Sequence, residues 1–300
     1  MARRARIATI AFGGDGRTPE EKRANALRMV DDAAALKPDI VCLPEVFTAL
    51  GYPCERFGEA AEPVPGPTTE AVGAVARQHG MWIICPIIEK QGERLYNSAV
   101  VIDRSGRVVG AYHKIHPTIS EIEAGVVPGE TPQVFQTDFG IIGCAICFDL
   151  NFRDVIEGLS QRGAEVVFFP SMYCGGLQLR IWAHDFGVFV ASAHSGGRSA
   201  IVDPLGRVLK WSSQYEPVIT CDANLDSVVL HIDDNYEKWP AIRRKYGASV
   251  EIDVSCDEAK FRLISHSTDV TARQVVEEFG LEPLGDYFAR AESVRRGALG

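Results

Sequence analysis

Three polar residues of this 300-residue sequence could act together as a base, a cation and a nucleophile. Glu45 ends the apolar run DIVCLPE, Lys114 lies in AYHKIHP, and Cys147 ends the apolar run IIGCAIC. A thiol that attacks an amide needs a base that takes its proton and later passes that proton to the leaving nitrogen. It also needs a positive charge or a pair of donors for the tetrahedral oxyanion. Glu45 can supply the first and Lys114 the second.

Cys147 stands where an apolar strand gives way to a helix that we expect to begin near Asn151 or Phe152. Such a turn exposes the thiol and places it close to a helix N-terminus, which favours the thiolate. We therefore expect an exposed, activated thiol. Buried thiols are expected for the cysteines inside strand-like runs, which are Cys42, Cys85 and Cys144.

The elements that must position these residues alternate between short apolar runs and amphipathic segments. The apolar runs are rich in Val and Ile, as strands buried on both faces are: RIATIAF, DIVCLP, WIICPII, NSAVVID, IIGCAI, EVVFFP, VFVASA, SAIVD and VITCD. Helices are expected between them, bounded by Pro, acidic residues or Gly, over 19–36, 69–79, 153–162 and 177–186. This alternation predicts an α/β layered fold.

A weak internal repeat divides the predicted domain into two halves. VIDRSGRVV over 101–109 matches IVDPLGRVL over 201–209, and each indicates a strand, a tight Gly turn and a return strand. PDIVCLPE over 38–45 resembles AEVVFFPS over 164–171. We therefore predict two sheets packed face to face inside one domain, with helices outside them.

Composition and charge exclude several classes of protein. The chain has 31 Lys and Arg against 40 Asp and Glu, a net charge of −9, which is a poor match for nucleic acid or an anionic membrane. No apolar run approaches the ~18 residues of a spanning helix. The eight dispersed cysteines do not indicate a secreted disulfide framework. We expect a cytoplasmic protein that binds neither nucleic acid nor membranes.

The three polar motifs together resemble those of the nitrilase superfamily, the carbon–nitrogen hydrolases. LPEVF, YHKIHP and GCAICFDLNFRD occur in the order and at separations similar to those of that family, over roughly residues 5–255. The resemblance implies a four-layer αββα sandwich. It also implies a triad with Glu45 as general base, Lys114 as oxyanion stabiliser and Cys147 as nucleophile, and it implies no metal and no cofactor.

Many members of the superfamily carry a second Glu shortly after the Lys, which orients the Lys. Glu121 and Glu123 are the candidates in KIHPTISEIEAGVVPG. The seven-residue spacing from Lys114 resembles the family spacing and favours Glu121.

The resemblance also indicates residues around the substrate. Phe148-Asp149 follows the cysteine where true nitrile hydrolases usually have Trp-Glu, and this resembles the amidase and carbamoylase branches. The backbone N–H of Phe148 would join Lys114 in the oxyanion hole. The candidate substrate-binding residues are Phe148, Ser171, Met172, Tyr173 and His194.

Two features leave the substrate open. Arg153 could hold a substrate carboxylate, or it could pair with Asp154 or Glu157. Many relatives have Asn after the strand that corresponds to VFVASA, whereas this chain has His194.

The predicted organisation is a hydrolase domain over 1–255 and a C-terminal arm over 256–300, with two helices within 269–296. The arm carries too much apolar surface to remain free in water. Relatives commonly pair through helices and use C-terminal arms, so we expect a homodimer or a higher homo-oligomer.

We predict a hydrolase that cleaves a non-peptide C–N bond, in a small-molecule amide or N-carbamoyl group, through a cysteine thioester with release of ammonia. Nitrile hydrolysis, or amide or acyl transfer on the same triad, is the alternative. A remoter alternative is a zinc or redox site at Cys144-Ala-Ile-Cys147, but no second CxxC or close HxxxH accompanies it. A non-enzymatic scaffold would be expected to lack a residue of the triad, and none is missing.

Overall fold

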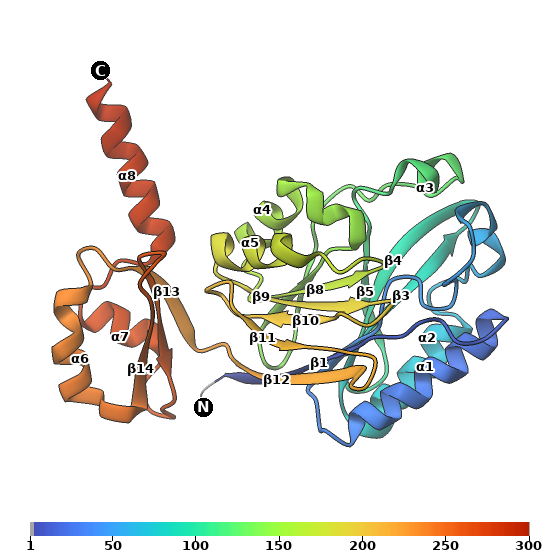
Figure 1. Ribbon diagram of the computed structural model, residues 1–300, viewed down its shortest axis with the longest axis horizontal. Coiled ribbons are helices and arrows are strands. Elements are labelled where there is room, and N and C mark those ends of the chain that lie inside the picture. The colour runs from blue at the N-terminus through green and yellow to red at the C-terminus, as the bar shows by residue number, and fades with distance from the viewer. Residues whose placement is uncertain (1–2, 300) are drawn as a thin grey trace. The chain divides into compact units, whose positions relative to one another are not determined.

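A computed structural model describes residues 3–299 of the chain (Figure 1). The chain divides into two compact units. The larger unit contains residues 5–223, and the smaller contains residues 224–299 together with Arg3 and Arg4.

The larger unit contains two six-stranded sheets within the described residues. The strands of the first sheet, in their order across it, are β12 (Val218–Asn224), β1 (Arg4–Ile10), β2 (Ile40–Cys42), β3 (Trp82–Gln91), β4 (Arg94–Ile102) and β5 (Val108–His113). Those of the second are β11 (Val208–Trp211), β10 (Ala200–Val202), β9 (Phe189–His194), β8 (Val166–Ser171), β7 (Ile141–Cys144) and β6 (Val134–Gln136).

The two sheets repeat one topology, as the internal sequence repeat predicts. In the first, β1, β2 and β3 are parallel, and β4 and β5 follow as antiparallel strands. In the second, β7, β8 and β9 are parallel, and β10 and β11 follow in the same way. The two hairpin turns match in detail, because the N–H of Asp103 donates to Arg107 O at 2.9 Å and that of Asp203 donates to Arg207 O at 2.9 Å.

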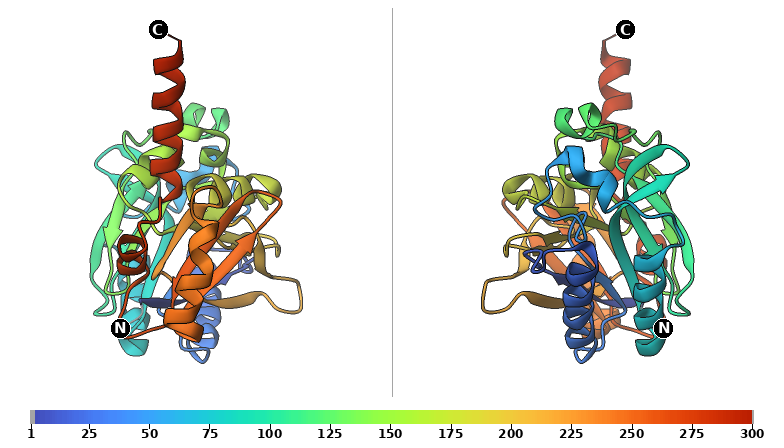
Figure 2. Two further views of the ribbon diagram at one scale, coloured as in Figure 1. Left: turned by 90° about the vertical axis from the view of Figure 1, so that its left-hand side faces the viewer. Right: turned by 90° about the vertical axis from the view of Figure 1, so that its right-hand side faces the viewer.

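Two pairs of helices cover the outer faces of the sheets (Figures 1 and 2). Apolar side chains of α1 (Pro19–Ala34) and α2 (Pro67–His79) pack on the first sheet, and those of α4 (Arg153–Gln161) and α5 (Gly176–Phe186) pack on the second. The sequence signals place these helices well. Thr18, for example, caps α1 by accepting a hydrogen bond from the N–H of Glu21. The result is the expected αββα sandwich.

The smaller unit has its own sheet, in the order β13 (Ser227–His231), β15 (Lys260–Ser265) and β14 (Val250–Ser255), and all its pairs are antiparallel. The helices α6 (Trp239–Tyr246), α7 (Ala272–Glu278) and α8 (Leu284–Ala298) accompany it. Apolar side chains of β13, β15, α6 and α7 form one core. The two helices expected within 269–296 are α7 and α8.

The boundary between the units lies at 223/224 and not at the expected 255/256. The reason is strand pairing. β13 and β14 flank β15, so Val228 and Ile252 both lie opposite Leu263. The C-terminal segment is therefore a small α/β unit of which the expected helical arm is only one part. A sequence pattern shows that a strand is amphipathic, but not which sheet it joins.

Short helices complete the loops that carry the functional residues. They are η1 (Cys54–Glu59), α3 (Ile119–Glu123) and η2 (Cys147–Asn151) in the larger unit, and η3 (Tyr236–Lys238) and η4 (Gly247–Ser249) in the smaller unit. Within residues 3–299, no helix combines the length and the hydropathy that crossing a bilayer would require.

Candidate active site

The three predicted reactive residues lie just beyond strand ends of both sheets. Glu45 follows β2 and Lys114 directly follows β5 in the first sheet, whereas Cys147 follows β7 in the second and opens η2. The backbone is left-handed at Cys147 (φ 48°) and at Val46 (φ 40°), next to Glu45. Such conformations are costly for residues with a side chain and concentrate at functional sites.

Lys114 lies between two buried carboxylates. Its Nζ is 2.8 Å from Glu45 Oε1 and 2.8 Å from Glu121 Oε2, and its side chain is 1% exposed. Burial by itself lowers the pKa of Lys114, but the negative charges beside it outweigh burial and raise the pKa above its usual range. The ammonium is therefore a fixed positive charge in a site shielded from water.

Of the two candidates for the second Glu, the structure places Glu121 against Lys114, whereas Glu123 is exposed. Thr118 caps α3, and its N–H donates to Glu121 Oε2 at 2.7 Å. Burial raises the pKa of Glu121, but the charge of Lys114 and the hydrogen bonds to this carboxylate outweigh it and lower the pKa.

Asn97 is a member of the site that the sequence reasoning missed. It lies on β4, is 1% exposed, and donates from Nδ2 to Glu45 Oε1 at 2.8 Å and to Glu121 Oε1 at 2.7 Å. The sequence feature that could have indicated it is the polar side chain of Asn97 at the start of the apolar run NSAVVID. A polar side chain that is buried in a strand needs hydrogen-bond partners. Which partners it has could not be deduced from the run itself.

Cys147 is buried, so the expectation of an exposed thiol is wrong. Its residue is 9% exposed. Burial and the negative charge of Glu45 raise the pKa of the thiol to about 12, and the ammonium of Lys114 offsets this only in part. Cys147 is the first residue of the short turn η2 and α4 begins only at Arg153, so a helix N-terminus does not offset the raised pKa of the thiol. The resting group is therefore a thiol that needs a base.

Residues after β8 lie against both Glu45 and Cys147. The N–H of Met172 donates to Glu45 Oε2 at 3.0 Å, and the hydroxyl of Tyr173 donates to Cys147 O at 3.0 Å. Ser171, the last residue of β8, is buried and its Oγ accepts from the N–H of Tyr173. The structure thus brings these three predicted pocket residues to the reactive groups.

The other two predicted pocket residues have different surroundings. Phe148 is half-buried, and its ring and that of Phe152 pack in a T-shaped arrangement with 5.3 Å between the ring centroids. His194 ends β9 opposite Ser171, accepts from the N–H of Gly196 at Nδ1, and has a pKa lowered by burial. A lowered pKa keeps the imidazole neutral at pH 7. His194 is therefore a neighbour of the segment after β8, and among the described residues it forms no hydrogen bond or ion pair with Glu45, Lys114 or Cys147.

Asp149 connects the cysteine turn to the lysine strand. This fully buried carboxylate accepts from the N–H of Ile146 at 2.8 Å, from the N–H of His116 at 2.8 Å and from the hydroxyl of Tyr112 at 2.7 Å. Burial raises its pKa, and these hydrogen bonds oppose the rise. One side chain therefore sets the position of Cys147 relative to that of Lys114.

Arg153 is occupied by acidic neighbours. Its Nε is 2.7 Å from Glu157, and its Nη1 is 3.5 Å from Asp185. Of the open possibilities for this residue, the structure shows pairing with Glu157.

The geometry does not support a zinc or redox site at Cys144 and Cys147. Cys144 lies within β7 and is fully buried, and burial raises its pKa to about 12. Cys144 and Cys147 are both free thiols. Within the part of the chain that the structure describes, no three His, Cys, Asp or Glu side chains are grouped as metal ligands.

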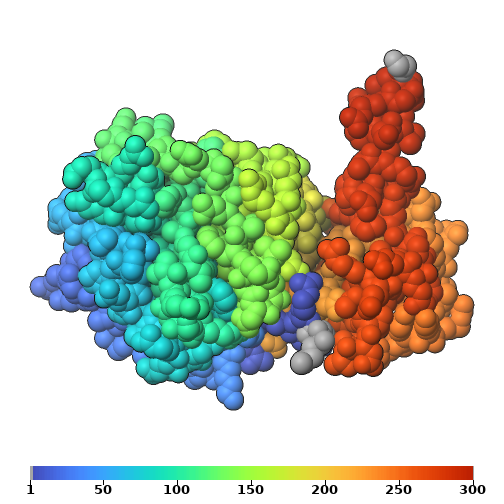
Figure 3. Space-filling model, turned by 180° about the vertical axis from the view of Figure 1, so that it is seen from behind, coloured from blue at the N-terminus to red at the C-terminus, as the bar shows by residue number. Residues whose placement is uncertain are grey.

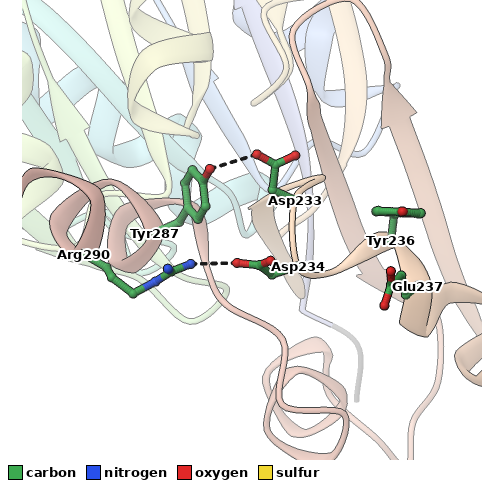
Figure 4. Close-up of a pocket in the computed structure, with 6 residues that line it drawn as sticks. All are labelled: Asp233, Asp234, Tyr236, Glu237, Tyr287 and Arg290. Carbon is green, nitrogen blue, oxygen red and sulfur yellow. Dashed lines mark hydrogen bonds and ion pairs between the residues drawn. The ribbon is translucent and has the colours of Figure 1, made fainter. Parts of the chain in front are cut away.

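A separate hollow of about 400 Å³ lies in the smaller unit (Figure 4). Asp233, Asp234 and Arg290 already have partners, since the hydroxyl of Tyr287 donates to Asp233 at 2.9 Å and Arg290 lies 2.9 Å from Asp234. It is lined by Asp233, Asp234, Tyr236, Glu237, Tyr287 and Arg290. This hollow shares no residue with the cluster around Cys147.

In sequence, the chain is similar to omega-amidases. An omega-amidase NIT2 from Xenopus tropicalis is 29% identical over 232 residues, which cover 69% of this chain and 84% of that protein. The human omega-amidase NIT2 is 27% identical over 246 residues, which cover 73% of this chain and 87% of that protein.

Two solved structures share the fold. Nit3 of Saccharomyces cerevisiae, a member of branch 10 of the nitrilase superfamily, superposes with a TM-score of 0.67 at 20% identity, covering 82% of this chain and 95% of that one. An amidase from Nesterenkonia sp. superposes with a TM-score of 0.66 at 22% identity, covering 81% of this chain and 97% of the amidase. The carbon–nitrogen hydrolase family matches residues 8–230, so most of the smaller unit lies beyond the match. The chain therefore belongs to the carbon–nitrogen hydrolase family of the nitrilase superfamily and is a hydrolase of carbon–nitrogen bonds.

Proposed function

We propose that this protein hydrolyses the C–N bond of a small linear amide through a thioester on Cys147, with Glu45 and Lys114 as its partners. The observation that carries the proposal is the buried arrangement of Lys114 between Glu45 and Glu121, beside a thiol whose pKa is about 12. A thiol that burial keeps protonated is reactive only with a base next to it. Glu45 is that base.

In the first half of the reaction, Cys147 attacks the amide carbonyl while its proton passes to Glu45. The carbonyl oxygen becomes an oxyanion, which the ammonium of Lys114 and the N–H of Phe148 stabilise. The first N–H groups of a helical turn such as η2 have no partner within the turn, so they are suited to this task. Glu45 then gives its proton to the leaving nitrogen, ammonia departs and a thioester remains.

In the second half, Glu45 takes a proton from a water that attacks the thioester. The tetrahedral intermediate uses the same oxyanion donors. It collapses to the carboxylic acid and restores the Cys147 thiol with the proton held by Glu45. Glu121 keeps Lys114 in place throughout, and its ionised form is favoured by the lowered pKa of its carboxyl group.

The substrate class rests on the relatives. The two relatives described above are omega-amidases, and a variant of the Nesterenkonia amidase carries the acetamide moiety of fluoroacetamide on its active-site cysteine. A linear amide is therefore the first candidate, and an N-carbamoyl group, which presents the same carbonyl beside nitrogen, is the second. Nitrile hydrolysis and transfer of the acyl group to an amine use the same triad and are alternatives.

A substrate panel tests the proposal. The purified protein is incubated with simple amides, ω-amides, N-carbamoyl amino acids and nitriles, and ammonia is measured with and without an added amine acceptor. We expect ammonia from at least one amide or carbamoyl compound, and an acyl adduct on Cys147 by mass spectrometry. Release from nitriles alone, or product only with the amine present, would support the alternatives. An adduct on another cysteine would refute the assigned nucleophile.

We also propose that the protein is a homo-oligomer of at least two chains. Residues 288–299 are all exposed (Figure 3), and they include Phe288 at 49%, Val294 at 65% and Leu299 at 73%. A helix of this length is marginal in water unless its apolar face is covered. Glu292 and Arg296 lie one turn apart, so antiparallel pairing with α8 of a second copy would match opposite charges.

Light scattering tests the assembly. We expect a mass of at least twice 32.8 kDa at micromolar concentration, and a lower mass for a variant with Phe288→Glu and Val294→Glu. A clean monomer would refute self-association. An oligomer whose mass the substitutions leave unchanged would place the interface elsewhere.

We further propose that the protein works in the cytoplasm. All eight cysteines are free thiols in the structure, which suits a reducing compartment. Fractionation of cells that express the untagged protein tests this, and recovery outside the cytosolic fraction would contradict it.

A further inference from the structure

The side chain of Asn97 makes contacts that its position in strand β4 does not by itself require. Its backbone belongs to β4, opposite Ile88 of β3, and its carbonyl accepts the N–H of Lys114 at 2.9 Å. The side chain therefore emerges beside the residue that carries the ammonium. Its two Nδ2 hydrogens are both used, one on Glu45 and one on Glu121, at 2.8 and 2.7 Å. Lys114 binds the same two carboxylates, which closes a ring of four side chains.

We propose that Asn97 is a positioning residue of the hydrolase, which holds Glu45 and Glu121 as a pair of anions in fixed places around Lys114. The inference rests on the proposed function, because it concerns the base and the cation of that reaction. Asn97 touches neither Cys147 nor a substrate in this role. It acts through the two carboxylates.

The orientation of the amide supports this role. Turned around, Asn97 would aim its carbonyl oxygen at two carboxylates, which is repulsive, so the observed orientation is the chemically sensible one. In that orientation Oδ1 is buried without a hydrogen-bond partner among the described residues. An unsatisfied buried acceptor is costly. Its presence indicates that the position is used for the two donors of the amide.

The charges around Asn97 explain why donors are needed there. Glu45 approaches from the segment after β2, Glu121 from α3, and Lys114 from the end of β5. One ammonium faces two carboxylates, so the ring holds one surplus negative charge. An N–H group that donates to a carboxylate favours the ionised form of that carboxylate. The lowered pKa of Glu121 includes a contribution from its hydrogen bond with Asn97.

Two substitutions of Asn97 reduce the number of side-chain hydrogen-bond donors at this position, from two to one or to none. Asn97→Leu has nearly the same size and no donor. Asn97→Ser has a single hydroxyl hydrogen, which can serve only one carboxylate. Ser98→Ala is the matched control, since Ser98 is the next residue of the strand, is buried, and donates to Glu89 at 2.7 Å instead.

The readout is kcat and kcat/KM against pH with the amide that the wild-type protein hydrolyses best. We expect Asn97→Leu to lower kcat by about a hundredfold, the scale of a small misplacement of reacting groups. The acidic limb of its pH profile should move up by about one pH unit, because anions that lose a charge-assisted hydrogen bond protonate more readily. Asn97→Ser should fall between Asn97→Leu and the wild type, and Ser98→Ala should keep the wild-type limb.

An unmoved acidic limb in both Asn97 variants would overturn the inference, even if kcat falls. If Asn97→Leu does not fold, the comparison between the wild type and Asn97→Ser alone decides. If the wild type hydrolyses no compound of the panel, the proposed function fails separately. Urea unfolding then still tests the ring, because the stability that Asn97 contributes should be present at pH 7 and shrink as the pH falls through the lowered pKa of Glu121. A stability difference that does not change with pH refutes the inference.

Discussion

Replacing Lys114 with methionine should destabilise the protein to a degree that depends on pH. Methionine keeps much of the length of the stem but leaves Glu45 and Glu121 buried without their cation. Their Oε1 atoms lie 2.8 and 2.7 Å from the same nitrogen of Asn97, so they are at most about 5.5 Å apart, and at an effective dielectric constant of ~20 two such charges repel by about 3 kcal/mol. Breaking a buried ion pair on one side costs about 3–5 kcal/mol, and we expect a loss of that size at about pH 8.

The sign of the pH dependence follows from the two carboxylates. In the wild type the pKa of Glu121 is lowered, so this group contributes stability above its unfolded pKa and loses it as the pH falls. In the variant the two anions relieve their repulsion by sharing a proton, so the folded state binds more protons than the unfolded state. Its stability therefore falls as the pH rises, by at most about 1.4 kcal/mol per pH unit for one proton. The loss of unfolding free energy in Lys114→Met, relative to the wild type, should be about 2 kcal/mol larger near pH 8 than near pH 5.

Urea unfolding followed by circular dichroism near both pH values measures this deficit. The double variant Lys114→Met with Glu121→Gln lacks the repulsion between the two carboxylates and should show a smaller pH dependence than the single variant. Lys210→Met is the surface control, because Lys210 pairs with Glu216 in an exposed position and should cost less than about 1 kcal/mol. An equal deficit at both pH values in the single variant would show that the two carboxylates are not held together as charges.

Four further outcomes are expected. Cys147→Ala should abolish turnover and keep the fold, whereas Cys144→Ala should retain substantial activity; equal activity in Cys147→Ala and wild type, measured as ammonia release, would contradict the assignment. Glu45→Gln should lower kcat at least about a hundredfold, and near wild-type turnover would leave Glu45 a structural acid. Because the pKa of Cys147 is raised to about 12, the ultraviolet difference spectrum between wild type and Cys147→Ala should show no thiolate at pH 7. Prolonged chelation should leave activity unchanged, and activity restored by Zn²⁺ would contradict this.

The fold and much of the site could be predicted from the sequence because their signals are local. Buried strands, capped helices and the hairpins around 103–107 and 203–207 follow from short stretches of chain, and the topology confirms two repeated sheets. Cys147 could be singled out because it stands at the end of an apolar run, whereas Glu45 and Lys114 gained their roles from the resemblance of the three motifs, taken together, to the nitrilase superfamily.

What could not be predicted depends on contacts between distant segments. The environment of Cys147 is set by Glu45 and by the loop after β8, so burial and the raised pKa of the thiol were not visible in the turn itself. Asn97 looks like one more strand residue until α3 and the end of β2 are placed beside it. The boundary of the smaller unit depends on which strand β13 and β14 pair with.

The division of the reactive groups between two sheets has a consequence for refolding. Each sheet can form its own ladder and bury its own helices without creating a working centre, because Glu45 and Lys114 come from one and Cys147 from the other. The first sheet is completed only when β12 pairs beside β1, some two hundred residues earlier in the chain. Closing such distant contacts is slow. The recovery of catalytic activity therefore reports when the two sheets have docked. We expect activity to return later than the far-ultraviolet circular dichroism signal.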